Sequence, residues 1–233
     1  MIRIIFCLLG CLLSYICFAQ ATALKGKISL LEQQLVKNPK NHEIYQSLTL
    51  LIPDHYVQIS KTERLQLSNF LKNHAFGSSL NISSNEEAGK HILIKGRVLD
   101  QKGKPIPNAF IHVFHADSKG YYAPTDSVNN SMAENDPRLF GFLRTDNSGS
   151  YEVKTIRPAS YPKQYNGRTI PQHIHFRIIA EGFAERNIQM VFEDDPAMSP
   201  YWKEWAKNLN YPIVKMIYSQ ENAFGVNDII LIK

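Results

Sequence analysis

Apolar residues recur at helical spacing in the first third of the chain. Within residues 20–75, Ile28, Leu31 and Leu35 fall on one stripe, and Lys, Glu and Gln fill the positions between them. Two internal prolines interrupt this segment, so the pattern predicts several short helices rather than one long helix. The next stretch, residues 76–90, is rich in Ser, Asn and Gly and is predicted to be a linker.

Beyond this linker the apolar runs become short, β-branched and separated by turn residues. Strands are predicted for HILIKGRVLD, AFIHVFHA, YEVKTI, HIHFRIIA, IQMVFE and VNDIILIK, with turns at clusters such as QKGKPIPN and DNSGS. Many short strands at even spacing are typical of a β-sandwich. We therefore predict a mainly β domain over residues 91–233, preceded by the small helical region. A single late helix is expected to begin at Pro200, with Ser199 as its N-terminal cap.

The beginning of the chain has the layout of a secretory signal. A basic residue, Arg3, precedes an apolar run over residues 4–18, and small residues follow. We therefore predict a signal peptide over residues 1–19, with cleavage near 19–21, and an exported protein in the periplasm or outside the cell. Two alternatives stay open: a retained anchor helix, or lipid attachment at Cys11, since LLGC resembles a lipoprotein box. Either would place the protein at a membrane.

The composition narrows the available chemistry. The 233 residues are 44% hydrophobic and 20% charged, which is ordinary for a globular protein. The net charge of +5 comes from scattered basic residues, so it does not indicate a nucleic-acid partner. All three cysteines, Cys7, Cys11 and Cys17, fall within the predicted leader. The remaining chain therefore has neither disulfides nor thiolates, and any catalysis must use oxygen and nitrogen groups.

The sharpest local feature is the sequence HIHF. Residues two apart in a strand project to the same face, so His173 and His175 point together while Ile174 and Phe176 point into the core. Two adjacent imidazoles form half of a metal site. Two solvent-exposed histidines would give the same pattern, so the motif by itself leaves both interpretations open.

Two tyrosines are candidates to complete such a site. Tyr161 lies in the proline-bracketed loop RPASYP, and Tyr122 closes the segment DSKGYY, each after a predicted strand. A phenol ionises readily only beside a hard, highly charged cation, and iron(III) is such a cation. A tyrosine at a strand end more often packs on the core, so a single one carries little weight.

Several motifs occur in an order that is similar to a known family. GRVLD, HADSKGYY, DPRLFGFLRTDNSGSY, TIRPASYP and HIHF lie between about residues 91 and 196. Together they resemble the intradiol ring-cleavage dioxygenases, of the protocatechuate 3,4-dioxygenase and catechol 1,2-dioxygenase types. The resemblance implies a β-sandwich with one iron(III) per chain, dioxygen as co-substrate and a small aromatic diol as substrate. The implied product is a muconate-type diacid.

The resemblance also assigns roles to individual residues. Tyr122 and His173 would be the equatorial metal ligands, and Tyr161 and His175 the axial ones. Tyr161 would also leave the metal and accept a substrate proton, which makes it a catalytic residue. Gln189 would orient the substrate and dioxygen by hydrogen bonding.

One position departs from the family pattern. The family has an arginine three residues before the first histidine, and this chain has Ile170 there. Arg168, five residues before His173, is the nearest substitute, and we expect it to stabilise charge on the substrate. A solvated loop arginine is the alternative. His112 and His115 also lie close to Tyr122 in sequence, but we expect them to pack in the core or to support the site rather than to bind metal.

Two other classes of function compete with the dioxygenase. GRVLDQKGKPIPNA is also similar to non-catalytic β-sandwich modules of exported proteins, which bind no metal. A zinc-binding hydrolase would keep a metal, but neutral tyrosines are poor zinc ligands. The sequence leaves open whether the helical region covers the sandwich, mediates assembly into a homo-oligomer or tethers the domain.

Overall fold

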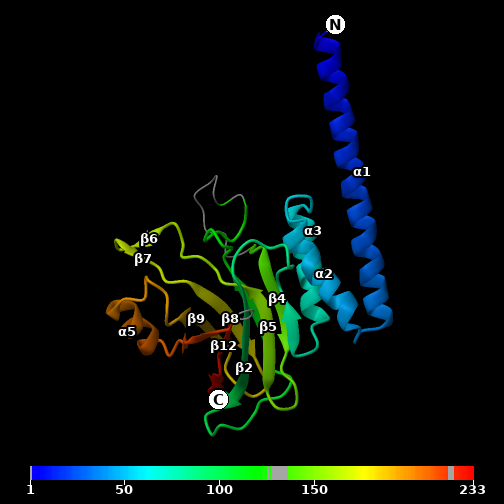
Figure 1. Cartoon of the computed structure of the whole chain (residues 1–233). Helices are drawn as coiled ribbons and strands as arrows, with labels where there is room; N and C mark the ends of the chain where they lie inside the picture. The colour runs from blue at the N-terminus through cyan, green and yellow to red at the C-terminus, as the bar shows by residue number, and fades with distance from the viewer. Residues whose placement is uncertain (1, 125, 127–135, 220–222) are drawn as a thin grey trace.

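In a computed structural model, the chain forms a β-sandwich flanked by helices (Figure 1). The structure describes residues 2–124, 126, 136–219 and 223–233. The predicted fold class, mainly β with helices at the N-terminus, is confirmed. Over the described residues, none of the helices combines the length and the apolar character that a membrane crossing requires.

The first sheet has six strands in the order β1-β5-β2-β12-β11, and β13 also pairs with β2. Its strands are β1 (Ser79–Asn81), β2 (His91–Asp100), β5 (Ser150–Ile156), β11 (Met216–Tyr218), β12 (Ala223–Val226) and β13 (Ile229–Leu231). β2 is the long central strand: it pairs antiparallel with β5 on one side and parallel with β12 and β13 on the other.

The second sheet has five strands in the order β10-β9-β8-β3-β4. Its strands are β3 (Phe110–His115), β4 (Leu139–Arg144), β8 (His173–Ile179), β9 (Arg186–Phe192) and β10 (Ile213–Val214). Alternation along β8 is as predicted, with Ile174, Phe176 and Ile178 buried in the core between the sheets. The other face of β8 is therefore left for polar side chains.

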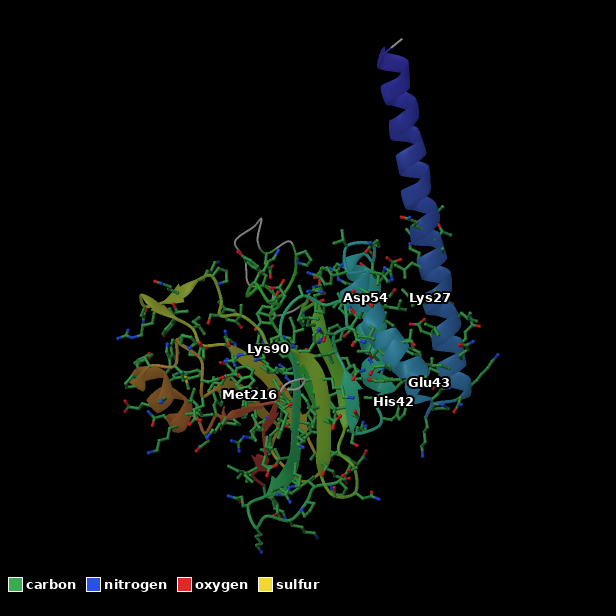
Figure 2. The ribbon with its side chains drawn as sticks, in the orientation of Figure 1. Lys27, His42, Glu43, Asp54, Lys90 and Met216 are labelled. Carbon is green, nitrogen blue, oxygen red and sulfur yellow. The ribbon has the colours of Figure 1, made fainter. Side chains whose placement is uncertain are left out.

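Three helices precede the sandwich: α1 (Ile2–Lys37), α2 (His42–Asp54) and α3 (Lys61–Asn73). α2 and α3 lie beside β4, and the N-terminal half of α1 extends away from the other elements (Figure 1). In Figure 2, His42 and Asp54 mark the two ends of α2, and Lys27 marks the neighbouring part of α1. The helices share the sandwich core, and the buried Tyr45 hydroxyl donates a 2.8 Å hydrogen bond to the Phe142 carbonyl of β4.

Two details differ from the sequence patterns. Residues 79–81, inside the segment expected as a linker, form β1 and pair in parallel with β5. The late helix, α5 (Pro200–Asn208), begins at Pro200 as expected, yet the Ser199 side chain makes no capping hydrogen bond. Pro200 lacks an N–H, so part of the usual need for such a cap is absent.

A short antiparallel hairpin, β6 (Gln164–Tyr165) and β7 (Arg168–Thr169), lies between β5 and β8 in the sequence. In Figure 1 it projects from the sandwich on the side of α5. The hairpin residues are solvent-exposed.

Candidate metal centre

Four side chains that are far apart in the sequence meet at one end of the second sheet. The Tyr122 hydroxyl lies 2.8 Å from His175 Nε2, and the Tyr161 hydroxyl lies 2.9 Å from His173 Nε2 and 3.4 Å from His175 Nε2. The two phenol oxygens are in direct contact with each other. Two oxygens and two nitrogens therefore converge on one point, and all four belong to the residues named from the sequence.

The imidazole of His173 is held in one tautomer. Its Nδ1 lies 2.7 Å from the Pro171 carbonyl oxygen, which can only accept a hydrogen bond. Nδ1 therefore carries the proton, and Nε2, which faces the Tyr161 oxygen, keeps its lone pair. Fixing one ring nitrogen by a carbonyl so that the other can bind a cation is the usual arrangement of a metal-binding histidine.

Burial keeps both histidines neutral. Desolvation lowers the pKa of His173, and it lowers the pKa of His175 well below the ordinary value, with the neighbouring His173 adding to the effect. The ring of His175 stacks on Phe114, with a centroid distance of 4.5 Å and an interplanar angle of 4°. Neutral, sterically fixed imidazoles are the form that binds metal ions.

The loops that carry the two tyrosines are joined by their backbones. The Ala159 N–H donates to the Asp117 carbonyl at 3.0 Å. Gly120, at φ 84°, lies so close to the second loop that an added Cβ would be 2.2 Å from the Ser160 carbonyl oxygen. Only glycine fits both this conformation and this approach. The motifs DSKGYY and RPASYP therefore form one structural unit, which brings Tyr122 rather than Tyr121 to the cluster.

Gln189 lies beside the cluster on β9. It is directly opposite His175 in the antiparallel pairing of β8 and β9, and it is half-buried. Residues directly opposite in a sheet share a face, so its amide lies on the same side as the two histidines.

Arg168 lies elsewhere. It is exposed on β7, and its guanidinium carbon is 4.5 Å from the centre of the Tyr201 ring of α5. Its Nη1 donates a long 3.4 Å bond to the Asn166 carbonyl. Within the described part of the chain, the hydrogen bond and ring contact that Arg168 makes are with Asn166 and Tyr201 rather than with the four converging side chains. Ile170, at the family's arginine position, packs against the apolar cluster around Trp202.

His112 and His115, the two further histidines considered from the sequence, are outside the cluster. His115 is fully buried, with Nδ1 2.6 Å from the Ala116 carbonyl and Nε2 2.6 Å from the Thr155 hydroxyl of the opposite sheet. Burial lowers its pKa to about 4, so it stays neutral and joins the two sheets. His112 lies among the aromatic rings of Phe114, Phe140 and Phe142.

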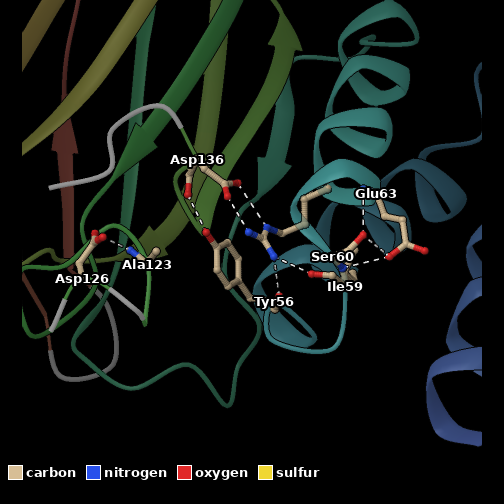
Figure 3. Close-up of polar contacts among 8 residues, drawn as sticks. Tyr56, Ile59, Ser60, Glu63, Ala123, Asp126 and Asp136 are labelled. Carbon is tan, nitrogen blue, oxygen red and sulfur yellow. Dashed lines mark hydrogen bonds and ion pairs between the residues drawn. The ribbon is translucent and has the colours of Figure 1, made fainter. Parts of the chain in front are cut away.

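Ion pairs hold Asp136 and Arg138, which lie before β4, and the sequence patterns did not indicate them. The Arg138 N–H donates to the Tyr122 carbonyl at 2.8 Å, and its guanidinium makes two 2.6 Å bonds to Glu87. Arg64 of α3 pairs with Asp136 at 2.6 Å, and the Tyr56 hydroxyl donates to the Asp136 carbonyl at 3.0 Å (Figure 3). Charged residues so far apart in sequence leave no spacing pattern that could have predicted these pairs.

A second polar network braces the start of β8. The Arg157 Nε donates to the Gln172 side chain at 2.6 Å, and its Nη2 lies 2.9 Å from Asp194. The Gln172 N–H donates to the Asp195 carboxylate at 2.5 Å. Arg157 lies four residues before Tyr161, and Gln172 immediately precedes His173. This network therefore connects the segment that carries Tyr161 with the segment that carries His173.

The chemistry of the donor set fits a ferric ion. Among the described residues, no three His, Cys, Asp or Glu side chains gather in a way that could hold a metal ion, so tyrosines would have to contribute. Two phenol oxygens in contact, each beside a neutral imidazole nitrogen, suit a hard trivalent cation that favours phenolate. The residues present therefore fit iron(III).

Comparisons with known proteins agree with the fold and the motifs. A family model described as Dioxygenase matches residues 69–222. The chain is 35% identical over 122 residues to the protocatechuate 3,4-dioxygenase β chain of Burkholderia cepacia, covering 51% of each sequence. It is 32% identical over 120 residues to a catechol 1,2-dioxygenase of Acinetobacter baylyi, covering 46% of this chain and 38% of that one.

Solved structures share the fold at lower identity. Catechol 1,2-dioxygenase from Pseudomonas arvilla C-1 superposes with a TM-score of 0.52 and 21% identity, over 67% of this chain and 57% of that one. An intradiol ring-cleavage dioxygenase from Tetranychus urticae gives a TM-score of 0.50 and 20% identity, over 67% and 86% of the two chains.

The chain therefore belongs to this dioxygenase family. Its similarity to catechol- and protocatechuate-cleaving enzymes confirms the resemblance to the intradiol group. The chain spans about half the length of the curated relatives it matches.

Proposed function

We propose that this chain is an iron(III) enzyme that uses dioxygen to cleave a catechol-type ring between its two hydroxylated carbons. The observation that carries the proposal is the convergence of Tyr122, Tyr161, His173 and His175 on one point. Membership of the dioxygenase family supports it. Breaking the bond between these two carbons and adding one atom of dioxygen to each of them gives a muconate-type diacid.

The four side chains would hold one iron(III) per chain. Bound there, the ion supplies a Lewis acid that holds both oxygens of an aromatic diol and draws electron density from its ring. Since His173 presents Nε2 with its lone pair and both histidines are neutral, neither must lose a proton to bind. The two tyrosines supply the negative charge as phenolates.

Tyr161 is the proposed proton acceptor. An aromatic diol must lose protons to bind a cation through both oxygens, and a phenolate oxygen released at that moment can take one of them. Tyr161 is half-buried, whereas Tyr122 is only 1% exposed, so Tyr161 has more room to move. Gln189, opposite His175, would orient the ring or dioxygen through its amide. Arg168 could act on the substrate only if the β6–β7 hairpin turned it away from Tyr201.

The centre can be tested by colour and by oxygen uptake. Charge transfer from tyrosinate to iron(III) absorbs visible light, so the iron-loaded protein is expected to be red to burgundy. Catechol, protocatechuate and hydroxylated variants should each be screened for uptake of dioxygen, with His173→Ala as the inactive control. A colourless protein that takes up no iron under oxidising conditions would contradict the metal centre. A coloured iron protein that consumes no dioxygen with any diol would contradict the activity alone.

We also propose that the protein is exported, on the basis of the leader pattern in residues 1–19 and the absence of cysteine after it. Sequencing the N-terminus of protein recovered from the periplasm or the medium should show cleavage near residues 19–21. Recovery of the intact leader, or of a chain beginning at a lipidated Cys11, would contradict the signal-peptide assignment.

A further inference from the structure

A cavity of about 200 Å³ lies between α3 and the face of the second sheet that carries the histidine pair. Ser68 of α3 lines one side, while His112 and Phe114 of β3, Phe140 of β4 and Arg177 of β8 line the other. None of the four proposed metal ligands lines it. Phe114 both lines this cavity and stacks on His175, so the cavity is a neighbour of the metal centre rather than part of it.

The walls of the cavity suit an aromatic ring. The rings of His112 and Phe114 lie 5.0 Å apart, and His112 meets Phe140 edge to face at 6.2 Å. An apolar cavity of about 150 Å³ is already large enough for benzene, so this volume accepts one ring with a small substituent.

Several polar groups of the cavity have no partner within the protein. No hydrogen bond is made by the ring nitrogens of His112 or by the hydroxyl of Ser68, as far as the described residues extend. Burial, with Arg177 nearby, lowers the pKa of His112 to about 3, so the ring is neutral and offers one donor and one acceptor. Among the described residues, the buried side-chain atoms without a partner are Trp202 Nε1 and Asn227 Oδ1, so the polar atoms of His112 and Ser68 are accessible and available to a ligand in the cavity.

The charge at the cavity rim is positive. Arg64 is neutralised by Asp136 at 2.6 Å. Arg177 uses only its Nε, which donates to Asn187 at 3.0 Å and lies 3.4 Å from the exposed Glu185. Both terminal nitrogens of Arg177 have no partner among the described residues, and a guanidinium with free terminal nitrogens matches a carboxylate.

We propose that this cavity binds a small aromatic carboxylate of the size of benzoate. The ring would lie against Phe114 and Phe140, and the carboxylate would accept hydrogen bonds from Arg177, from the Ser68 hydroxyl and from the N–H of His112. The site is separate from the metal centre, and the proposal does not depend on the ring-cleavage activity.

Calorimetric titration of the iron-loaded protein with benzoate tests this directly. We expect a Kd on the order of 1 mM or below, which is reasonable for a ligand of this size. Arg177→Gln should weaken binding by about tenfold or more, since a charged hydrogen bond is lost. Arg97→Gln is the matched control, because Arg97 is 53% exposed with an ion pair of 3.3 Å and Arg177 is 52% exposed with one of 3.4 Å.

A cavity-filling variant gives a second, independent measurement. Ser68→Leu should remove detectable binding, while Ser47→Leu, on the exposed surface of α2, should leave it unchanged. Toluene, which has the same shape without the charge, should bind more weakly than benzoate. The double variant His173→Ala with His175→Ala should retain benzoate binding although it has lost the metal centre.

Three results would overturn the proposal. The first is no binding of benzoate at several times the expected Kd. The second is binding that survives Ser68→Leu but disappears in the double histidine variant, which would place benzoate at the metal centre. The third is equal weakening by Arg177→Gln and Arg97→Gln, which would show only a general effect of protein charge. Arg177 is exposed, so its variant is expected to fold even if Ser68→Leu does not.

Discussion

Tyr122 and Tyr161 reach the same point from loops that are supported in different ways. The Tyr122 carbonyl accepts a backbone hydrogen bond from Arg138, whose side chain forms a nearly buried pair with Glu87. The Tyr161 loop leads into the exposed β6–β7 hairpin, which touches α5 through aromatic contacts such as Tyr165 with Trp202 at 6.4 Å.

This difference matches the two roles that we propose for the tyrosines as metal ligands. Tyr122, which is 1% exposed and bonded through its carbonyl to Arg138, would remain bound throughout a reaction. Tyr161, which is half-buried beside an exposed hairpin, would leave and return at lower cost. The helical region contributes to the first role, because Arg64 and Tyr56 bind Asp136, two residues before Arg138. We therefore infer that the helices cover the sandwich and brace one side of the centre.

The largest expected effect is on iron affinity and follows from removing the phenol of Tyr122. Tyr122→Phe should cost more iron affinity than the roughly 10–100-fold that is typical when a neighbour of a ligand is lost, because here the ligand itself disappears. Iron content after dialysis and the visible absorption measure this directly. Tyr121→Phe is the matched control and should keep both. Full iron content in Tyr122→Phe would show that Tyr122 is not a ligand.

The ion pair between Arg138 and Glu87 should matter chiefly for the stability of the folded protein. Arg138→Met leaves Glu87 buried without a partner, since the two side chains are only 13% and 10% exposed. We expect the free energy of unfolding to fall by about 3–5 kcal/mol. Chemical denaturation of the metal-free protein measures it, and adding Glu87→Leu to Arg138→Met should recover most of the loss. A double variant as unstable as the single one would show that the pair is not what stabilises the folded protein.

Removing the phenol of Tyr161 should separate metal binding from turnover. Tyr161→Phe is expected to keep iron, because the buried Tyr122 and both histidines remain, but to change the colour and to lower kcat by about 100-fold, the lower end of the effect of a positioned base. Single-turnover kinetics and the absorption spectrum test this. If Tyr161→Phe lost iron as completely as Tyr122→Phe, the two sides of the centre would not differ in role.

The local parts of this centre could be predicted from the sequence, and the reason is geometric. His173 and His175 share a face because a strand alternates, which needs no knowledge of the rest of the chain. Tyr122 could be chosen over Tyr121 only by resemblance, since the deciding contact is between Gly120 and Ser160, in loops forty residues apart.

Features that depend on distant partners could not be predicted. In β4, five of the six residues are buried, so the strand shows no alternation. Its Gly141 has no room for a Cβ, which would lie 2.4 Å from Leu80 Cδ2. Leu80 belongs to β1, in the segment that was expected to be a linker because its composition is polar. β1 forms through parallel pairing with β5, a contact across about seventy residues that composition does not reveal.

The smallest effect is expected from substituting Arg168. This residue lies on the exposed β6–β7 hairpin, on the side of the site that holds Tyr161. Arg168 was expected to replace the family's arginine, which is missing at Ile170, whereas its guanidinium lies against Tyr201 and its side chain is exposed. If it stays there, Arg168→Gln should lower kcat/KM by less than about threefold, far below the roughly 100-fold that loss of a charge-stabilising donor costs. Steady-state oxygen uptake measures it, with Arg97→Gln as the control for a surface arginine. A loss near 100-fold would mean that the hairpin carries Arg168 to the substrate during turnover, and the side of the centre that holds Tyr161 would then be the moving part of the enzyme.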